Sequence, residues 1–169
     1  MSPSTRPSRP ASRPARPRAS YAFTGRWHLD APPERVRDVV VDLERYPQWW
    51  PQVVAVASLG ADDAWVVCRS TLPYALDLRL HAVDRELPAL EVEVGGDLHG
   101  RVRFVLEPSG AGTLLCLEQD VEVRGLLALL TPLARPLLVW NHDRMMRGCV
   151  AGLRRQLAGR GEAVPPQRR

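Results

Sequence analysis

Alternating apolar and polar residues mark the first regular element of the chain. From Tyr21 to Leu29 the apolar positions recur at every second residue, which is the period of a β-strand with one buried face. Asp30 is then predicted to be the N-cap of a helix. The two prolines that follow suit a first turn, and Glu34 suits the positive end of the helix dipole. We expect this helical segment to stop at Pro47, since the residue before a proline resists the helical conformation.

The middle of the chain predicts an antiparallel meander. Between Val53 and Arg124, five or six apolar-rich runs are separated by residues that are typical of turns. Consecutive strands joined by short turns pair antiparallel. After Gly125 the period changes to that of a helix, which we expect to be broken or kinked near Pro132 and Pro136 and continuous thereafter.

The final helix is predicted to be amphipathic. At 100° per residue, one face about 100° wide holds residues suited to burial. These are Leu138, His142, Met145, Cys149, Gly152, Leu153 and Gln156. The opposite side is charged, so we expect this helix to lie with its apolar stripe on the concave face of a curved sheet, in an α+β fold.

Charge separates two tails from a central domain. The sequence has 169 residues, and its 23 basic residues are all arginine, against 19 acidic ones. Residues 1–20 carry five arginines and no acid, residues 160–169 carry three arginines and one acid, and residues 21–159 are mildly acidic. Tails of this composition bury too little apolar surface to offset their ordering entropy, so we expect them to be disordered around one domain at 21–159. A polycationic arm that contacts acidic lipid or nucleic acid is the other interpretation of the first tail.

Several functional classes are excluded by what the sequence lacks. Without lysine there is no Walker A loop, no pyridoxal Schiff base and no catalytic lysine. Three widely spaced cysteines give neither a disulfide framework nor the spacing of zinc ligands. The central domain lacks the positive charge of a folded nucleic-acid-binding surface, and no apolar run is long enough to span a bilayer. We therefore expect a cytoplasmic protein with no transmembrane segment, no metal and no cofactor.

Two motifs near the start of the domain carry a resemblance to a known superfamily. They are Trp27-His-Leu-Asp-Ala-Pro-Pro-Glu-Arg-Val36 and Asp42-Leu-Glu-Arg-Tyr-Pro-Gln-Trp-Trp-Pro51, followed later by Pro108-Ser-Gly-Ala-Gly-Thr113 and the long final helix. In these features the chain resembles the START-like or SRPBCC superfamily, and more narrowly its polyketide cyclase/dehydratase branch. The resemblance implies the helix-grip fold, in which a curved antiparallel sheet wraps around a long C-terminal helix, with two short helices after the first strand.

The resemblance also implies a deep, largely apolar cavity between the sheet and the final helix. Members of the superfamily include polyketide aromatase/cyclases, lipid carriers and quinone-binding proteins. The expected partner is therefore a hydrophobic small molecule of one of these kinds, bound by a monomer or a homodimer.

Strand alternation predicts which side chains face this cavity. Inner positions of the later strands are occupied by Leu78, Phe104, Leu117 and Gln119. On the run from Ala64 to Leu72 the pattern is less clear, and the resemblance favours the face that carries Trp65 and Arg69. Other elements add Trp50, Asn141, His142, Met145 and Cys149 to the expected ligand-binding residues.

Arg69 and His142 are the candidate catalytic residues. An arginine in an apolar cavity is a charge-assisted partner for a ligand carbonyl, carboxylate or enolate, but a structural ion pair or an arginine facing water fits the pattern as well. His142 could move a proton during an aldol condensation or a dehydration, although lone histidines are commonly core or surface groups. Gln119 could contact a ligand or cross-link the core, and Met145 and Cys149 also fit ordinary packing.

We expect a polyketide cyclase/dehydratase-like protein, with a non-catalytic lipid or quinone carrier or sensor as the alternative. Two departures from the family pattern weaken the catalytic interpretation. Ala82 stands where the resemblance implies an arginine in the aromatase/cyclases, and Cys149 stands where it implies an amide. A third hypothesis is an interaction protein that uses its arginine-rich arm.

Overall fold

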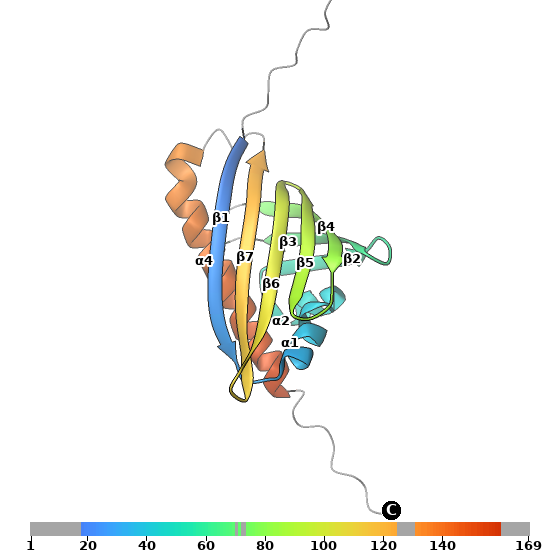
Figure 1. The fold of residues 1–169 in the computed structure, drawn as a ribbon. Helices are drawn as coiled ribbons and strands as arrows, with labels where there is room; N and C mark the ends of the chain where they lie inside the picture. Colours follow the sequence, from blue (N-terminus) through green and yellow to red (C-terminus); the bar gives the residue numbers. More distant parts are fainter. Residues whose placement is uncertain (1–17, 70, 72–73, 125–130, 160–169) are drawn as a thin grey trace, which may run out of the picture.

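The computed structural model describes residues 18–69, 71, 74–124 and 131–159, and it shows a curved sheet gripping a long helix (Figure 1). The strands are β1 (Arg18–Leu29), β2 (Val53–Ser58), β3 (Asp63–Arg69), β4 (Ala75–Asp84), β5 (Ala89–Gly96), β6 (Leu98–Ser109) and β7 (Gly112–Arg124). The helical elements are α1 (Pro33–Val40), the 3₁₀ turn η1 (Leu43–Arg45), α2 (Tyr46–Trp49) and α4 (Thr131–Gly159).

The seven strands form one antiparallel sheet in the order β1-β7-β6-β5-β4-β3-β2. Strands β2 to β7 follow one another as the predicted meander, and β1 pairs with β7, the last strand of the chain. The predicted α+β class and helix-grip fold are confirmed by this topology. The register between β1 and β7 sets Phe23 opposite Gln119, which brings residues far apart in the sequence together.

The N-terminal end of α1 differs from the prediction. This helix begins at Pro33, and its N-cap is Pro32, so the prediction that Asp30 caps the helix is wrong. Pro32 is extended, with φ −66° and ψ 154°, and the helical turn starts only after it. Asp30 is therefore too far upstream to reach the first free amide groups.

The ends of β1 and α4 also refine the predicted boundaries. β1 starts at Arg18, so the disordered tail predicted to end at Ser20 overlaps three residues of strand. α4 continues through Pro136 as one helix rather than breaking there. The remaining parts of the predicted tails, residues 1–17 and 160–169, lie outside the described residues, as do residues 125–130.

The predicted orientation of β3 is wrong. Ala64, Val66 and Cys68 are buried, whereas Arg69 is exposed. Trp65 lies on the same outer face, where its indole N–H donates a hydrogen bond to the carboxylate of Asp77. The other inner-face predictions hold, because Leu76, Leu106, Leu115 and Leu117 are buried.

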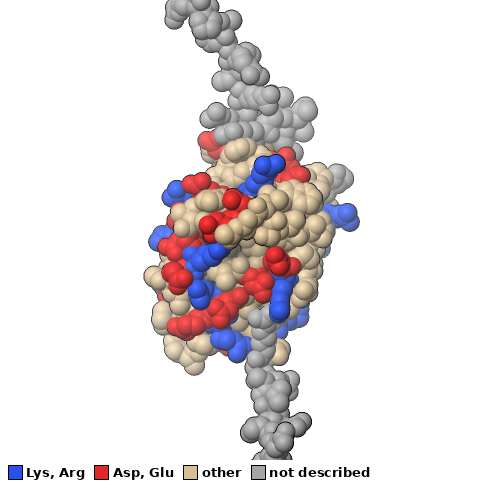
Figure 2. Space-filling model, turned by 90° about the vertical axis from the view of Figure 1, so that its right-hand side faces the viewer, with Lys and Arg blue, Asp and Glu red and all other residues tan. Residues whose placement is uncertain are grey.

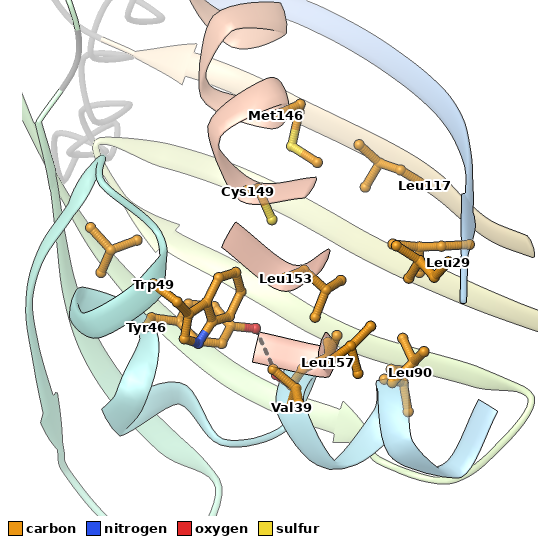
Figure 3. Packing of buried hydrophobic residues seen from close by; sticks show 14 of the residues in the cluster. Leu29, Val39, Tyr46, Trp49, Leu90, Leu117, Met146, Cys149, Leu153 and Leu157 are labelled. Carbon is orange, nitrogen blue, oxygen red and sulfur yellow. Dashed lines mark hydrogen bonds between the residues drawn. The ribbon is translucent and has the colours of Figure 1, made fainter. Parts of the chain in front are cut away.

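The C-terminal half of α4 packs tightly against α2 through two glycines. A Cβ atom at Gly152 would overlap the backbone carbonyl of Trp49, and one at Gly148 would overlap the side chain of Gln52. Figure 3 shows Cys149, Leu153 and Leu157 of α4 in the same cluster as Tyr46 and Trp49. This end of α4 is therefore fixed close to the short helices.

Replacing Gly152 by alanine tests this close approach. We expect Gly152→Ala to lower the free energy of unfolding by about 1–3 kcal/mol, because the new methyl group must push α4 away from α2. Chemical denaturation measures the change. Gly159→Ala is the matched control, since nothing lies near a Cβ at that position. Equal stability of the two variants would contradict the packing described.

Candidate functional site

A cavity of about 180 Å³ lies between the concave face of the sheet and the helical elements. The strands line it with Val53, Val66, Cys68, Leu78, Leu80, Ala82, Leu90, Val92, Val94, Val102, Phe104, Leu117, Gln119 and Val121. The helical elements and the loops next to them add Val40, Val41, Leu43, Tyr46, Trp50, His142, Met145 and Met146, and the end of β4 and the residue after it add Asp84 and Arg85. Apolar cavities of this kind stay dry when empty and accept hydrophobic guests.

One row of side chains crosses the sheet beneath the cavity. Ala82 pairs with Val92, Val92 with Val102, and Val102 with Gln119. Gln119 in turn pairs with Phe23 of β1. Because paired residues of neighbouring strands point to the same face, this row runs over an apolar floor to a polar group at one end.

His142 and Gln119 form the polar end of the cavity. The His142 Nε2 atom lies 3.4 Å from Gln119 Oε1, and the imidazole ring stacks on Phe23 with centroids 3.7 Å apart. With Nε2–H donating to the glutamine, Nδ1 carries a lone pair and has no hydrogen-bond partner among the described residues. Phe23 was not predicted as a site residue, although its inner position on the first strand was visible in the alternation.

Burial keeps His142 uncharged. Only 17% of its side chain is exposed, and desolvation lowers its pKa below the usual 6.5. The Asp143 carboxylate opposes this effect in part, but its Oδ1 lies 3.7 Å from Nδ1, which is too far for a hydrogen bond. His142 is therefore a neutral imidazole at neutral pH.

Two aromatic residues in and beside α2, Tyr46 and Trp50, line the cavity and carry polar atoms. The Trp50 Nε1 atom is buried and has no hydrogen-bond partner among the described residues. Tyr46 instead donates its hydroxyl hydrogen to the carbonyl oxygen of Val40, at 2.6 Å. Burial also raises the pKa of Tyr46, so the phenol stays protonated and its hydroxyl hydrogen stays bonded to Val40.

Charged residues line the cavity only where it meets solvent. Asp84 and Arg85 are the exposed members of the lining. Arg85 is already engaged, because it donates to the Ala61 carbonyl at 2.7 Å and pairs with Asp62 at 3.1 Å. Asp84 ends β4 and Arg85 follows it, and Val41, which also lines the cavity, follows α1, so the mouth opens between these two segments.

Four predicted site residues lie away from this cavity. Trp65 and Arg69 occupy the outer face of β3 and are absent from the cavity lining. The prediction that they contact a ligand in the cavity is therefore not supported. Asn141 is buried, and its Oδ1 accepts a hydrogen bond from the Thr71 amide while it lines a smaller adjoining cavity. Cys149 is buried in the core rather than on the cavity wall. By contrast, the cavity lining includes Trp50, Leu78, Phe104, Leu117, Gln119, His142 and Met145, and their contact with a ligand stays a prediction.

The buried thiols are unsuited to nucleophilic chemistry. Burial raises the pKa of Cys149 to about 12 and that of Cys68 to about 11. Each thiol therefore stays protonated at neutral pH, and the thiolate is the reactive form. Among the residues that the structure describes, no three His, Cys, Asp or Glu side chains come together as metal ligands. No helix of the described chain is both long and apolar enough to cross a bilayer.

The family model described as polyketide cyclase / dehydrase and lipid transport matches residues 21–159. The chain belongs to this family. A comparison with curated proteins finds no match. The family's fold is one that binds hydrophobic ligands, in agreement with the apolar cavity.

Solved structures share the fold of this family member. The Zhui aromatase/cyclase from Streptomyces sp. R1128 has a TM-score of 0.73 at 14% identity, covering 86% of this chain and 98% of that one. The protein TTHA0849 from Thermus thermophilus has a TM-score of 0.72 at 17% identity, covering 85% and 100%. A START superfamily protein from Mycobacterium smegmatis has a TM-score of 0.69 at 18% identity, covering 82% and 97%.

The burial of neutral His142 predicts a dependence of stability on pH. The pKa of His142 is lowered on folding, so below 6.5 the unfolded chain takes up a proton that the folded cavity disfavours. Stability contributed in this way is complete above pH 6.5 and is lost as the pH falls. From about pH 7 to about pH 5 we expect the native chain to lose up to about 2 kcal/mol more stability than His142→Gln. Denaturant titrations at each pH measure this, and parallel losses would contradict a desolvated imidazole.

Proposed function

We propose that residues 21–159 bind an uncharged, largely apolar ligand whose polar atoms are hydrogen-bond acceptors, such as the carbonyl oxygens of a polyketide-like or quinone-like ring compound. The observation that carries this proposal is which polar groups line the cavity. Its wall offers the donors of Trp50 and Gln119, the charged groups nearby are paired or lie at the mouth, and His142 Nδ1 is an acceptor without a partner among the described residues.

Two donors support a ligand with carbonyl groups. The indole Nε1–H of Trp50 can only donate, and it has no partner among the described residues. The side-chain oxygen of Gln119 faces His142 Nε2, which leaves the amide nitrogen of Gln119 for a ligand. A ligand oxygen that accepts from either group removes the cost of burying an unpaired donor.

The electrostatics of the cavity favour an uncharged ligand. His142 is neutral, Arg69 lies on the outer face of the sheet, and Arg85 is paired with Asp62 at the mouth. A carboxylate or ammonium group within the apolar wall would lack a counter-charge and would be buried at a cost of several kcal/mol.

A second candidate function is proton transfer on the bound carbonyl compound, as in a cyclase or dehydratase. The observation that favours it is a buried imidazole that lines the cavity and whose Nδ1 has no hydrogen-bond partner among the described residues. Such a base can remove a proton from the carbon next to a carbonyl, and a donor such as the Gln119 amide then stabilises the enolate. Arg69, which was predicted to share this role, takes no part in the proposal.

A pair of matched probes tests the binding proposal. 1-Tetralone carries one carbonyl, and 1,2,3,4-tetrahydronaphthalene has nearly the same shape without it. We expect the native protein to bind the ketone up to about tenfold more tightly, because one net hydrogen bond contributes about 0.5–1.5 kcal/mol. Isothermal titration calorimetry measures both affinities.

Substitution of the two donors identifies the partner of the carbonyl. We expect Trp50→Phe or Gln119→Leu to remove the preference for the ketone while the hydrocarbon still binds. Gln48→Leu is the control, since Gln48 is exposed and lies outside the cavity lining. Persistence of the full preference in the Trp50/Gln119 double variant would refute the proposal.

Hydrogen–deuterium exchange tests the second candidate. In D₂O, a base that removes a proton from C2 of bound 1-tetralone returns a deuteron in its place, and mass spectrometry detects the gain. If the protein catalyses this step, the native chain exchanges the proton faster than buffer does. The His142→Gln variant then loses this excess exchange, while its affinity for the ketone falls by less than about tenfold. Exchange that equals the buffer rate, with binding intact, would leave a carrier.

A further inference from the structure

The outer face of α4 carries arginines that the rest of the domain does not neutralise. Within residues 131–159 there are five arginines and one acid, Asp143, whereas residues 18–124 hold 11 arginines and 17 acids. Arg144, Arg147 and Arg155 are exposed, and none of them pairs with an acid among the described residues. At 100° per residue these three lie on the side of the helix opposite to His142 and Leu153.

The sheet side of the molecule is different. Arg101 and Arg103 pair with Glu91 at 3.1 Å and 3.9 Å, and Arg103 also pairs with Glu118 at 3.2 Å. Figure 2, which views the side where β2 to β4 lie in Figure 1, shows acidic and basic groups intermixed. As a segment, α4 therefore carries a net positive charge, whereas residues 18–124 carry a net negative charge.

Two large apolar side chains accompany these arginines. Leu137 is 47% exposed and Trp140 is 43% exposed, on the same outer side of α4. The Arg144 guanidinium lies 5.9 Å from the centre of the Trp140 ring, so the tryptophan and a positive charge form one unit. Exposed tryptophan and leucine beside arginine are the combination that suits the interface of an anionic bilayer.

We infer that this outer face of α4, formed by Leu137, Trp140, Arg144, Arg147 and Arg155, docks on the surface of a membrane that contains anionic lipids. The arginines contact lipid phosphates, while Trp140 and Leu137 enter the region between headgroups and acyl chains. A nucleic acid would satisfy the arginines but would leave the leucine in water. Charge complementarity and the exposed apolar pair together favour the lipid surface.

Docking by this face would bring the cavity close to the bilayer. His142 and Met145 line the cavity from the inner side of the same turns that present Trp140 and Arg144 outward. A smaller cavity of about 80 Å³, lined in part by Leu138, shares His142 and Met145 with the main one.

Vesicle co-sedimentation of the full chain tests the docking face. We expect binding to vesicles of phosphatidylcholine mixed with phosphatidylglycerol, weak binding to phosphatidylcholine alone, and loss of binding as salt increases. Arg147→Glu should weaken binding to the mixed vesicles by about fivefold or more. Trp140→Gln should weaken it by a similar factor without any change of charge.

Matched variants elsewhere separate this face from general charge. Arg79→Glu makes the same charge change on an exposed position of β4, and Leu59→Gln removes an exposed apolar side chain far from α4 in the sequence. Both should bind vesicles like the native chain. Equal effects of Arg147→Glu and Arg79→Glu, or undiminished binding of Trp140→Gln, would overturn the inference. A shift of Trp140→Gln from dimer to monomer in sedimentation, with vesicle binding unchanged, would overturn it in favour of a second copy of this chain.

Binding of 1-tetralone in the absence of vesicles is measured on the same variants. Normal ketone binding together with lost vesicle binding would show that docking and the cavity act separately. Failure of ketone binding alone would count against the proposed function and leave the docking face standing.

Discussion

The close contact between α4 and α2 decides where the cavity can form. At Gly152 the backbone of α4 approaches the backbone carbonyl of Trp49 so closely that no side chain fits between them, and at Gly148 it contacts the side chain of Gln52. Beyond this contact Leu153 and Leu157 are buried in the core. Toward the other end of the helix, His142 and Met145 are only partly buried and face a void. The helix thus packs at one end and covers a cavity at the other.

The apolar and the polar atoms of the cavity wall have different roles. A continuous apolar floor supplies non-directional affinity for a hydrophobic guest, which depends mainly on the area removed from water. The few polar atoms then decide which guest is held and in which orientation. Because burial makes His142 neutral and leaves the Trp50 N–H without a partner, the buried part of the cavity wall carries no charge among the described residues. The same neutrality leaves His142 able to accept a proton, so binding and proton transfer are compatible uses of one site.

Much of the fold could be predicted because its elements have strong periodicity. The alternation on β4, β6 and β7 contrasts apolar with charged residues, so the inner faces of these strands were assigned correctly. β3 has no such contrast, because Trp65 and Val67 on one face alternate with Val66 and Cys68 on the other. Its orientation is instead set by pairing with β4, where Asp77 on the outer face accepts the hydrogen bond from Trp65. This error is the reason that Arg69 was predicted as a site residue.

The polar end of the cavity was predicted only in part, for a related reason. Gln119 and His142 were identified one at a time, from a strand face and a helix face. Their contact with each other and with Phe23 depends on the register of β1 against β7 and on the position of α4, both of which are tertiary. Local patterns report which face is buried, but not which residues from distant segments meet there.

The two sides of α4 connect the cavity with the outer surface of the protein. Successive residues of a helix point in different directions, so the turns that carry His142 and Met145 inward must present Trp140 and Arg144 outward. Because those outward residues are arginine and tryptophan rather than the acids that predominate elsewhere in the domain, the helix that covers the cavity carries a net positive charge, whereas residues 18–124 are net acidic. A surface attracted to that charge would therefore meet the protein beside the cavity and not at the opposite edge of the sheet.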